Sequence, residues 1–340
     1  MKICVVSTTV LLVPPKGYSG LEQLAWQQAD GLARRGHHVM LVAPHGSTPP
    51  DGVELHGTTL REGDKQAYSG YWHRLPGFDA VIDNSWEKWP LILKSEGKLS
   101  APVLTVLHAP VETMMGAPPP VDKACFVAIS KDQAGAVAGH LGRDARVCYN
   151  GVDMDYYKPS PTPPKRERYL FLARMSKLKG PHVAVQVATK CGVELDLIGD
   201  DTLVESPAYA KAIRDTCDGK RIVYHGGKER SQCAEFFRRG KALLHCNFVF
   251  REPFGLSPVE AQASGCPVIA ADHGAMRETV KHGESGFLVR TVEEIERLVA
   301  DNAVADLKPA RCRAWAEQFS VKNMVLRYEE LCKEAIDHPW

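Results

Sequence analysis

The stretch Phe250–Ala263, F-R-E-P-F-G-L-S-P-V-E-A-Q-A, places Glu252 and Glu260 eight positions apart. Its residue order predicts a loop, a tight turn and then the start of a helix. Ser257 is a favourable N-cap, Pro258 suits the first helical position, and Glu260 stands where a capping box has its glutamate. A helix N-terminus carries unpaired N–H groups and partial positive charge, so it can bind phosphate. Two carboxylates beside an anion site suit a ligand with both phosphates and hydroxyls, such as a nucleotide-sugar.

A capping box alone is common in helices that bind nothing, so the surrounding residues matter. The run from Glu252 continues E-P-F-G-L-S-P-V-E-A-Q-A-S-G-C-P-V-I-A and is followed by H-G-A-M-R-E-T-V and G-E-S-G-F-L-V. This pattern resembles the E-x7-E donor-site signature of glycosyltransferase family 4, the retaining glycosyl transferases group 1. The resemblance covers most of residues 1–340. It implies an α/β protein of the GT-B fold, with two Rossmann-like, doubly wound domains facing each other across a cleft.

The composition is that of a globular protein with two domains. A chain of 340 residues exceeds one ordinary core, 44% of it is hydrophobic and 24% charged, and its net charge is +1. No basic tract predicts a nucleic-acid partner. The ten cysteines stand singly, without metal-ligand spacing, so we expect reduced thiols in a cytoplasmic protein. The apolar N-terminus predicts a buried strand, not a signal peptide. No segment is apolar enough to span a bilayer, so we expect at most peripheral membrane contact.

Alternating strand and helix patterns predict the domain boundaries. Apolar runs at 2–6 and 38–43 flank a helical pattern at 20–35, which is a βαβ unit and implies a parallel sheet. The pattern restarts after a Pro-rich linker at 158–168. We therefore predict domains at 1–158 and 169–315, which the resemblance assigns to the acceptor and to the nucleotide-sugar donor. A helical pattern covers 308–335, and the resemblance implies that 316–340 crosses back to the first domain. Further strands are predicted at 80–83, 102–107, 124–129, 146–149, 169–173, 194–198, 221–224, 242–245 and 267–270.

Two cations occupy the segment A-R-M-S-K-L-K-G, residues 173–180. Arg174 follows a predicted strand and Lys179 precedes a predicted helix. Cations at the carboxyl edge of a sheet can neutralise a diphosphate, whereas a pair placed elsewhere would be ordinary surface charge. The segment resembles the family's G-R-x-x-x-x-K-G motif, with Ala173 in place of the first glycine. The resemblance implies that Arg174 and Lys179 bind the donor phosphates.

The first half of the chain supplies two further candidates. Gly20 lies in the loop P-P-K-G-Y-S-G-L-E, which resembles the family's Gly-Gly-x-Glu loop facing the donor diphosphate and the acceptor, although Ser19 replaces the first glycine. A plain connecting loop is the alternative. His108 follows a predicted buried strand, where a lone histidine is commonly structural. The family has a histidine at the corresponding point near the reacting sugar, where a neutral imidazole could bond a hydroxyl or position the acceptor.

The resemblance also gives roles to the residues of the opening stretch. It implies that Glu252 contacts hydroxyls of the donor sugar and that Glu260 contacts the ribose. A carboxylate suits this role because it can accept hydrogen bonds from two neighbouring hydroxyls. The backbone amides of Phe254, Gly255 and Leu256 are expected to hold the sugar and the diphosphate.

The resemblance implies a retaining, hexosyltransferase-type transfer from a nucleotide-sugar, with a UDP-sugar as the family's commonest donor. The acceptor is not identified: a saccharide, a lipid-linked glycan or a natural product is expected, bound by loops at 14–20, 63–74 and 110–120. We expect no metal and no other cofactor, because no Asp-x-Asp pair follows a strand as a cation anchor would. Arg174, Lys179 and helix dipoles would neutralise the phosphates instead.

Two other functions remain open. A GT-B phosphorylase or epimerase would share the fold, but the phosphorylase needs a pyridoxal lysine, for which the sequence offers no convincing candidate. A non-catalytic nucleotide-sugar-binding partner subunit is disfavoured because the candidate residues Arg174, Lys179, Glu252 and Glu260 are all present. A covalent role for Glu252 would require a second carboxyl acid close by, and Glu260 is assigned to the helix start.

Overall fold

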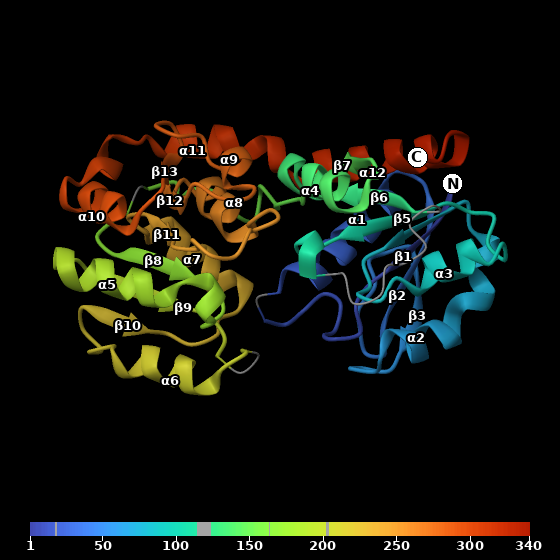
Figure 1. The fold of residues 1–340 in the computed structure, drawn as a ribbon, viewed down its shortest axis with the longest axis horizontal. Helices are drawn as coiled ribbons and strands as arrows, with labels where there is room; N and C mark the ends of the chain where they lie inside the picture. The colour runs from blue at the N-terminus through green and yellow to red at the C-terminus, as the bar shows by residue number, and fades with distance from the viewer. Residues whose placement is uncertain (18, 114–123, 163, 202–203) are drawn as a thin grey trace. The chain divides into compact units, whose positions relative to one another are not determined.

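The computed structural model describes residues 1–17, 19–113, 124–162, 164–201 and 204–340 (Figure 1). The chain forms two compact units, Met1–Gly151 with Val321–Trp340, and Val152–Ser320. The division falls after Gly151, so the described residues of the Pro-rich stretch 158–168 belong to the second unit. The side chain of Arg166 in that stretch donates a hydrogen bond to the carbonyl oxygen of Gly265. The stretch is thus anchored to the second unit.

The first unit is built on a parallel sheet with strand order β3-β2-β1-β4-β5-β6-β7. The order reverses between β1 and β4, and ligands of doubly wound folds bind at the carboxyl ends of strands at such a switch point. The predicted strand at 2–6 is confirmed as β1, whose residues from Ile3 to Val6 are buried. The strands are β1 (Lys2–Val6), β2 (His38–Pro44), β3 (Val53–Thr58), β4 (Ala80–Asp83), β5 (Val103–Leu107), β6 (Cys125–Ala128) and β7 (Ala145–Val147).

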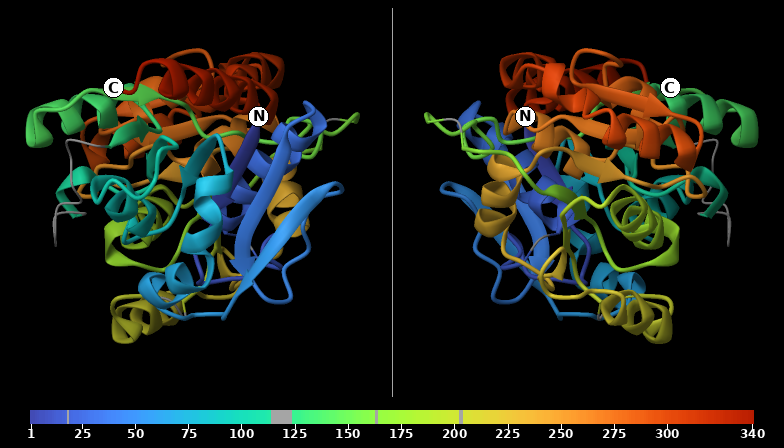
Figure 2. Two further views of the ribbon diagram at one scale, coloured as in Figure 1. Left: turned by 90° about the vertical axis from the view of Figure 1, so that its right-hand side faces the viewer. Right: turned by 90° about the vertical axis from the view of Figure 1, so that its left-hand side faces the viewer.

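Helices cover this sheet, and the C-terminal helix α12 packs against α1 (Figures 1 and 2). Gly31 of α1 permits the close approach, because a Cβ there would lie 2.2 Å from Cγ2 of Val325. Glu329 of α12 pairs with Arg35 and, at 2.7 Å, with Lys333. The helices of this unit are α1 (Gly20–Arg34), α2 (Asp64–Tyr71), α3 (Trp89–Ser95), α4 (Lys131–Leu141) and α12 (Val321–Asp337).

The Glu329 ion pairs should make the stability of the first unit depend on acid pH. Hydrogen bonds from Arg35 and then Lys333 lower the pKa of Glu329 to about 2. The unfolded chain has the ordinary value of about 4.3, so the stabilisation is complete above that pH and is lost as pH falls toward 2. We expect Glu329→Gln to lower Tm by about 2–4 °C at pH 7. Thermal melts from pH 7 to 2 should show the two proteins converging; a constant difference would contradict this reading.

The second unit is built on a parallel sheet with strand order β10-β9-β8-β11-β12-β13. Its switch point lies between β8 and β11. Both units are therefore Rossmann-like and doubly wound, which confirms the predicted α/β class. The strands are β8 (Tyr169–Leu172), β9 (Leu195–Ile198), β10 (Ile222–Tyr224), β11 (Leu243–His245), β12 (Val268–Ala271) and β13 (Gly286–Val289). The helices are α5 (Pro181–Cys191), α6 (Pro207–Asp215), α7 (Arg230–Arg239), α8 (Leu256–Ala263), α9 (Met276–Thr279), α10 (Val292–Ala300) and α11 (Pro309–Ala316).

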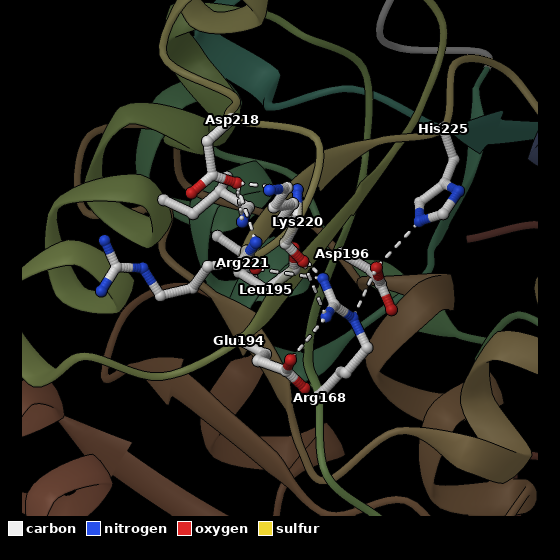
Figure 3. Close-up of polar contacts among 9 residues, drawn as sticks. Arg168, Glu194, Leu195, Asp196, Asp218, Lys220, Arg221 and His225 are labelled. Atoms are coloured by element: carbon white, nitrogen blue, oxygen red, sulfur yellow. Dashed lines mark hydrogen bonds and ion pairs between the residues drawn. The ribbon is translucent and has the colours of Figure 1, made fainter.

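A polar cluster ties together β8, β9 and β10 of this sheet (Figure 3). The guanidinium of Arg168, just before β8, donates to the Asp196 carboxylate at 2.9 Å and to the carbonyl oxygens of Leu195 and Arg221 at 3.1 and 3.0 Å. His225, just after β10, lies 2.8 Å from the same carboxylate. Each buried polar group of the cluster thus has a partner from a neighbouring strand, which stabilises this edge of the sheet.

Three expectations for the secondary structure differ from the structure. The segment 63–74 was expected to be a loop, but Asp64–Tyr71 form helix α2 and a 3-10 helix follows it. The helical pattern at 308–335 is interrupted, because a 3-10 turn at Glu317–Phe319 separates α11 from α12. Phe319 is buried there against Phe254, with ring centroids 5.7 Å apart, and this tertiary contact overrides the helical periodicity. Strands β3 and β13 were not predicted. Both lie at an edge of their sheet and contain partly exposed residues, so neither shows a continuous apolar run.

Candidate functional site

Helix α8 begins earlier than the capping-box pattern predicts. Its first residue is Leu256 and its N-cap is Gly255, which makes no side-chain cap hydrogen bond. Gly255 has φ of 84°, a left-handed conformation that favours glycine, so the chain turns before Ser257. Pro258 then lies within the first turn, where its missing N–H has no helical partner to lose. The prediction that Ser257 caps this helix is therefore wrong.

Glu252 precedes α8 and forms the centre of a compact polar cluster. Its Oε2 lies 2.5 Å from Nζ of Lys179, 3.5 Å from Nδ2 of Asn247 and 3.9 Å from Nε2 of His245. The Lys179 ammonium also lies over the ring of Phe250, 4.6 Å from its centroid. The side chains of Lys179 and Glu252 are only 18% and 14% exposed, so the pair is largely shielded from water.

The switch point of the second sheet explains why these residues meet. Arg174 and Lys179 follow β8, Glu252 follows β11, and these two strands are adjacent. Gly180 brings the two loops together: its φ is 76°, and a Cβ there would lie 2.1 Å from the carbonyl oxygen of Cys246. On the other side, the amide of Ala275 donates to the carbonyl oxygen of Glu252 at 3.0 Å.

Gly180 should accordingly be intolerant of a side chain. We expect Gly180→Ala to cost more than the ~1–2 kcal/mol of a left-handed alanine, because the backbone of Cys246 must also move. It should also separate Lys179 from Glu252. Gly192, at the other end of α5, is the matched control, since its φ is 67° and a Cβ added there would meet nothing within 4 Å. Urea unfolding compares the variants; equal losses of stability would contradict the close-approach argument.

The neighbours of Glu252 favour the ionised form of its carboxylate. Burial raises the pKa of Glu252, but the Lys179 ammonium and the other neighbours outweigh it, so the net shift is downward. Burial lowers the pKa of His245 to about 4, which leaves this imidazole neutral at pH 7.

Arg174 is exposed at the end of β8. A hydrogen bond from Ser176, helped by the charges of Arg174 and Lys179, lowers the pKa of Glu205.

Glu260 is buried inside α8, next to Tyr157 and Arg230. Burial first, and then the Glu260 charge, raise the pKa of Tyr157 well above its ordinary value. Nε of Arg230 donates to the phenol oxygen of Tyr157 at 3.3 Å. This carboxylate therefore belongs to an internal network of the second unit, and its contact with a ribose stays a prediction.

The remaining predicted residues of the second unit are the loop Phe254–Leu256. Phe254 is buried, and Gly255 and Leu256 form the start of α8. The N–H groups of a first helical turn have no partner within the helix. Their proximity to Lys179 and Glu252 follows from the short chain between Glu252 and Leu256. Sequence reasoning missed Asn247 and His245; the only signal was that polar residues stand at the carboxyl end of β11.

The candidates of the first unit also lie at the carboxyl edge of their sheet. Gly20 is the first residue of α1, just after the loop that follows β1. Glu22, in the first turn of α1, is buried and accepts hydrogen bonds from Thr8 at 2.6 Å and from Ser19. His108 follows β5 and bonds Asn84, which follows β4. Of the predicted acceptor loop 110–120, residues 114–120 lie outside the described residues.

Two features are absent from the described residues. No cluster of three or more His, Cys, Asp or Glu side chains there has the arrangement of a metal site. None of the helices described has the length and apolar character needed to cross a membrane.

Comparison with known proteins places the Lys179–Glu252 cluster inside a recognised domain. Residues 155–318 match the family described as Glycosyl transferases group 1. This segment of the chain belongs to that family. The group 1 domain contains Arg174, Lys179, Glu252 and Glu260, whereas His108 and Gly20 lie before it.

Proteins similar to this chain include curated enzymes and solved structures. A D-inositol 3-phosphate glycosyltransferase of Xylanimonas cellulosilytica is 31% identical over 57% of this chain and 53% of its own. The chain thus spans about half the length of the curated relatives it matches. The solved glycosyltransferase AviGT4, of avilamycin A biosynthesis, is 23% identical, with TM-score 0.75 over 99% of this chain and 98% of that one. Anabaena HepE in complex with UDP-glucose is 19% identical, with TM-score 0.79 over 98% of this chain and 100% of that one. These likenesses show the GT-B fold.

Proposed function

We propose that the protein is a retaining glycosyltransferase that moves a hexose from a nucleotide-sugar, with a UDP-sugar as the first donor to test, to a hydroxyl-bearing acceptor. The main support for this proposal is the Lys179–Glu252 ion pair. It lies at the switch point of the second sheet, directly before the N-terminus of α8. The cation and the helix N-terminus suit the diphosphate end of a nucleotide-sugar, and the carboxylate suits the hydroxyls of its sugar end. HepE, which shares the fold, has been solved with UDP-glucose.

In the proposed site the diphosphate lies toward Lys179, Arg174 and the amides at the start of α8. Glu252, ionised at neutral pH, accepts hydrogen bonds from hydroxyls of the donor sugar. Lys179 contacts the Glu252 carboxylate in the structure, so the ammonium can bridge the sugar side and the phosphate side of one ligand. Metal-independence is part of the proposal, because these positive groups supply the charge that a divalent cation would otherwise provide.

The proposed reaction breaks the bond between the anomeric carbon and the phosphate oxygen. A bond from the same carbon to the acceptor oxygen forms on the same face, and the departing phosphate takes the acceptor's proton. The protein contributes positioning and stabilisation of the charge that develops on the leaving phosphate. Glu252 forms no covalent bond in this scheme, because its ion pair with Lys179 makes the carboxylate a weaker nucleophile.

A thermal-shift screen against UDP-, GDP- and ADP-sugars tests the binding part of the proposal. A ligand that binds only the native state raises Tm, and the rise grows with the logarithm of the ratio of free ligand concentration to Kd. We expect one nucleotide class to raise the Tm of the wild type and to lose that effect in Lys179→Met. Sugar release from the same donor then tests catalysis. A protein that binds the donor but neither hydrolyses nor transfers it would instead be the non-catalytic binding subunit.

A further inference from the structure

A buried hydrogen-bond chain leads from α1 to His108 in the first unit. Nε2 of His108 lies 2.8 Å from Oδ1 of Asn84. Nδ2 of Asn84 donates to Oε1 of Gln28 at 2.9 Å and to the carbonyl oxygen of Val6 at 3.1 Å. Nε2 of Gln28 returns a hydrogen bond to Oδ1 of Asn84 at 3.4 Å. Asn84 and Gln28 are both 1% exposed, so water does not compete for these bonds.

The hydrogen bonds of Asn84 determine which ring nitrogen of His108 carries hydrogen. The carbonyl oxygen of Val6 can only accept, so the group of Asn84 beside it must be the NH₂. The other atom, Oδ1, therefore faces His108, and an amide oxygen also only accepts. Nε2 of His108 must then be the donor. A neutral imidazole carries one N–H, so Nδ1 of His108 holds a lone pair.

Nδ1 is the nitrogen that a ligand can reach. Nδ1 has no hydrogen-bond partner among the residues the structure describes. It is also not fully buried, and His108 as a whole is half-buried. The ring is also kept neutral. Burial, and then the charge of Lys88, lower the pKa of His108 to about 3. An imidazole of this kind accepts a hydrogen bond but does not take the proton.

We propose that Asn84 and Gln28 are positioning residues that hold His108 as its Nε2–H tautomer, so that Nδ1 accepts a hydrogen bond from a substrate hydroxyl. The identity of that hydroxyl, on a sugar or polyol ligand, rests on the proposed function. The tautomer itself rests on the contacts of Asn84 and on the neutrality of the His108 ring. This role agrees with a reaction in which the leaving phosphate receives the acceptor's proton, because His108 orients the hydroxyl and leaves its proton in place.

The tautomer can be measured without any substrate. Long-range ¹H–¹⁵N spectra of protein labelled at its histidine rings separate a nitrogen that carries hydrogen from one with a lone pair, and His108→Gln identifies the signals. At pH 7 we expect hydrogen on Nε2 of His108 and a lone pair on Nδ1. Hydrogen on Nδ1, or on both nitrogens, would overturn the proposal. A protein that shows the expected tautomer but transfers no sugar would refute the proposed function and leave the Asn84 contact intact.

Two variants then test positioning. Asn84→Leu removes the acceptor for Nε2–H and should let the other tautomer appear, with kcat lower by about tenfold to 10²-fold and the KM for the donor little changed. Asn84→Asp keeps the acceptor, so the tautomer should persist while its negative charge raises the pKa of His108 and moves the acid limb of the pH–rate profile upward. Asn323→Ala, on the exposed face of α12, is the control.

A second variant, Gln28→Leu, keeps the proposal testable if Asn84→Leu does not fold. Gln28→Leu leaves Asn84 in place but removes one of the two groups that orient its amide. It should shift the tautomer balance in the same direction as Asn84→Leu, by a smaller amount. If Asn84→Leu and Gln28→Leu both fold and keep the wild-type tautomer and kcat, the two residues do not position His108.

Discussion

Lys179→Met should lower kcat by about 10²–10³-fold, the loss measured when one preorganised group that stabilises developing negative charge is removed. The ammonium lies 2.5 Å from Glu252. The two residues belong to the loops that follow the adjacent strands β8 and β11, and these loops meet at the proposed phosphate site. Methionine preserves most of the side-chain length and removes the charge. The variant also leaves Glu252 without its main counter-charge, so the pKa of that carboxyl should rise.

Steady-state rates at saturating donor measure this effect. Lys177→Met is the matched control, because Lys177 lies in the same turn, carries the same charge and is exposed. We expect the control to stay near the wild-type rate, and Lys179→Arg to recover part of the loss. A Lys179→Met rate close to that of Lys177→Met would show that the ammonium does not act on the leaving phosphate. Melting curves of both variants separate this result from a loss of folding.

Glu252→Gln should weaken the use of the donor by about ten- to hundredfold in kcat/KM. Glutamine keeps the shape but replaces a charged acceptor, and hydrogen bonds to charged groups contribute about 1.5–3 kcal/mol. The substitution also ends the ion pair with Lys179, which frees the ammonium to move. Glu235→Gln, an exposed glutamate of α7, controls for the change in net charge.

Mass spectrometry of the wild type during turnover supplies a second check on Glu252. The proposed mechanism predicts unmodified protein throughout. A glycosyl adduct on Glu252 would make this residue a covalent nucleophile and would require a nearby carboxyl acid. The ion pair with Lys179, 2.5 Å from Glu252 Oε2, argues against that role, since a positive neighbour lowers the nucleophilicity of the carboxylate.

The two-domain α/β fold could be predicted from the sequence because the central strands are buried on both faces. Such strands read as apolar runs, as Lys2–Val6 and Tyr169–Leu172 do. The edge strands β3 and β13 escaped notice because their residues are partly exposed. The start of α8 was misplaced for a local reason. Ser257 fits the N-cap pattern, but only Gly255 tolerates the left-handed conformation that the turn requires.

Motifs predicted the candidate residues but not their partners. Arg174, Lys179 and Glu252 could be named from local patterns, whereas the Lys179–Glu252 contact depends on β8 lying beside β11, which is a property of the strand order. For the same reason no pattern pointed to Asn84. Its contact with His108 exists because β4 and β5 are neighbours, and a lone asparagine after a strand has no signature of its own.

The most direct test of the account compares the dissociation constants of a nucleotide-sugar and of its free nucleoside diphosphate, by calorimetry, for the wild type, Glu252→Gln and Lys179→Met. The donor is the one that raises Tm most in the thermal-shift screen. If Glu252 contacts the sugar and Lys179 the diphosphate, Glu252→Gln should weaken only the nucleotide-sugar, and Lys179→Met should weaken both ligands. Equal affinities in all three proteins, or a loss in Glu252→Gln that is the same for both ligands, would contradict the proposed site.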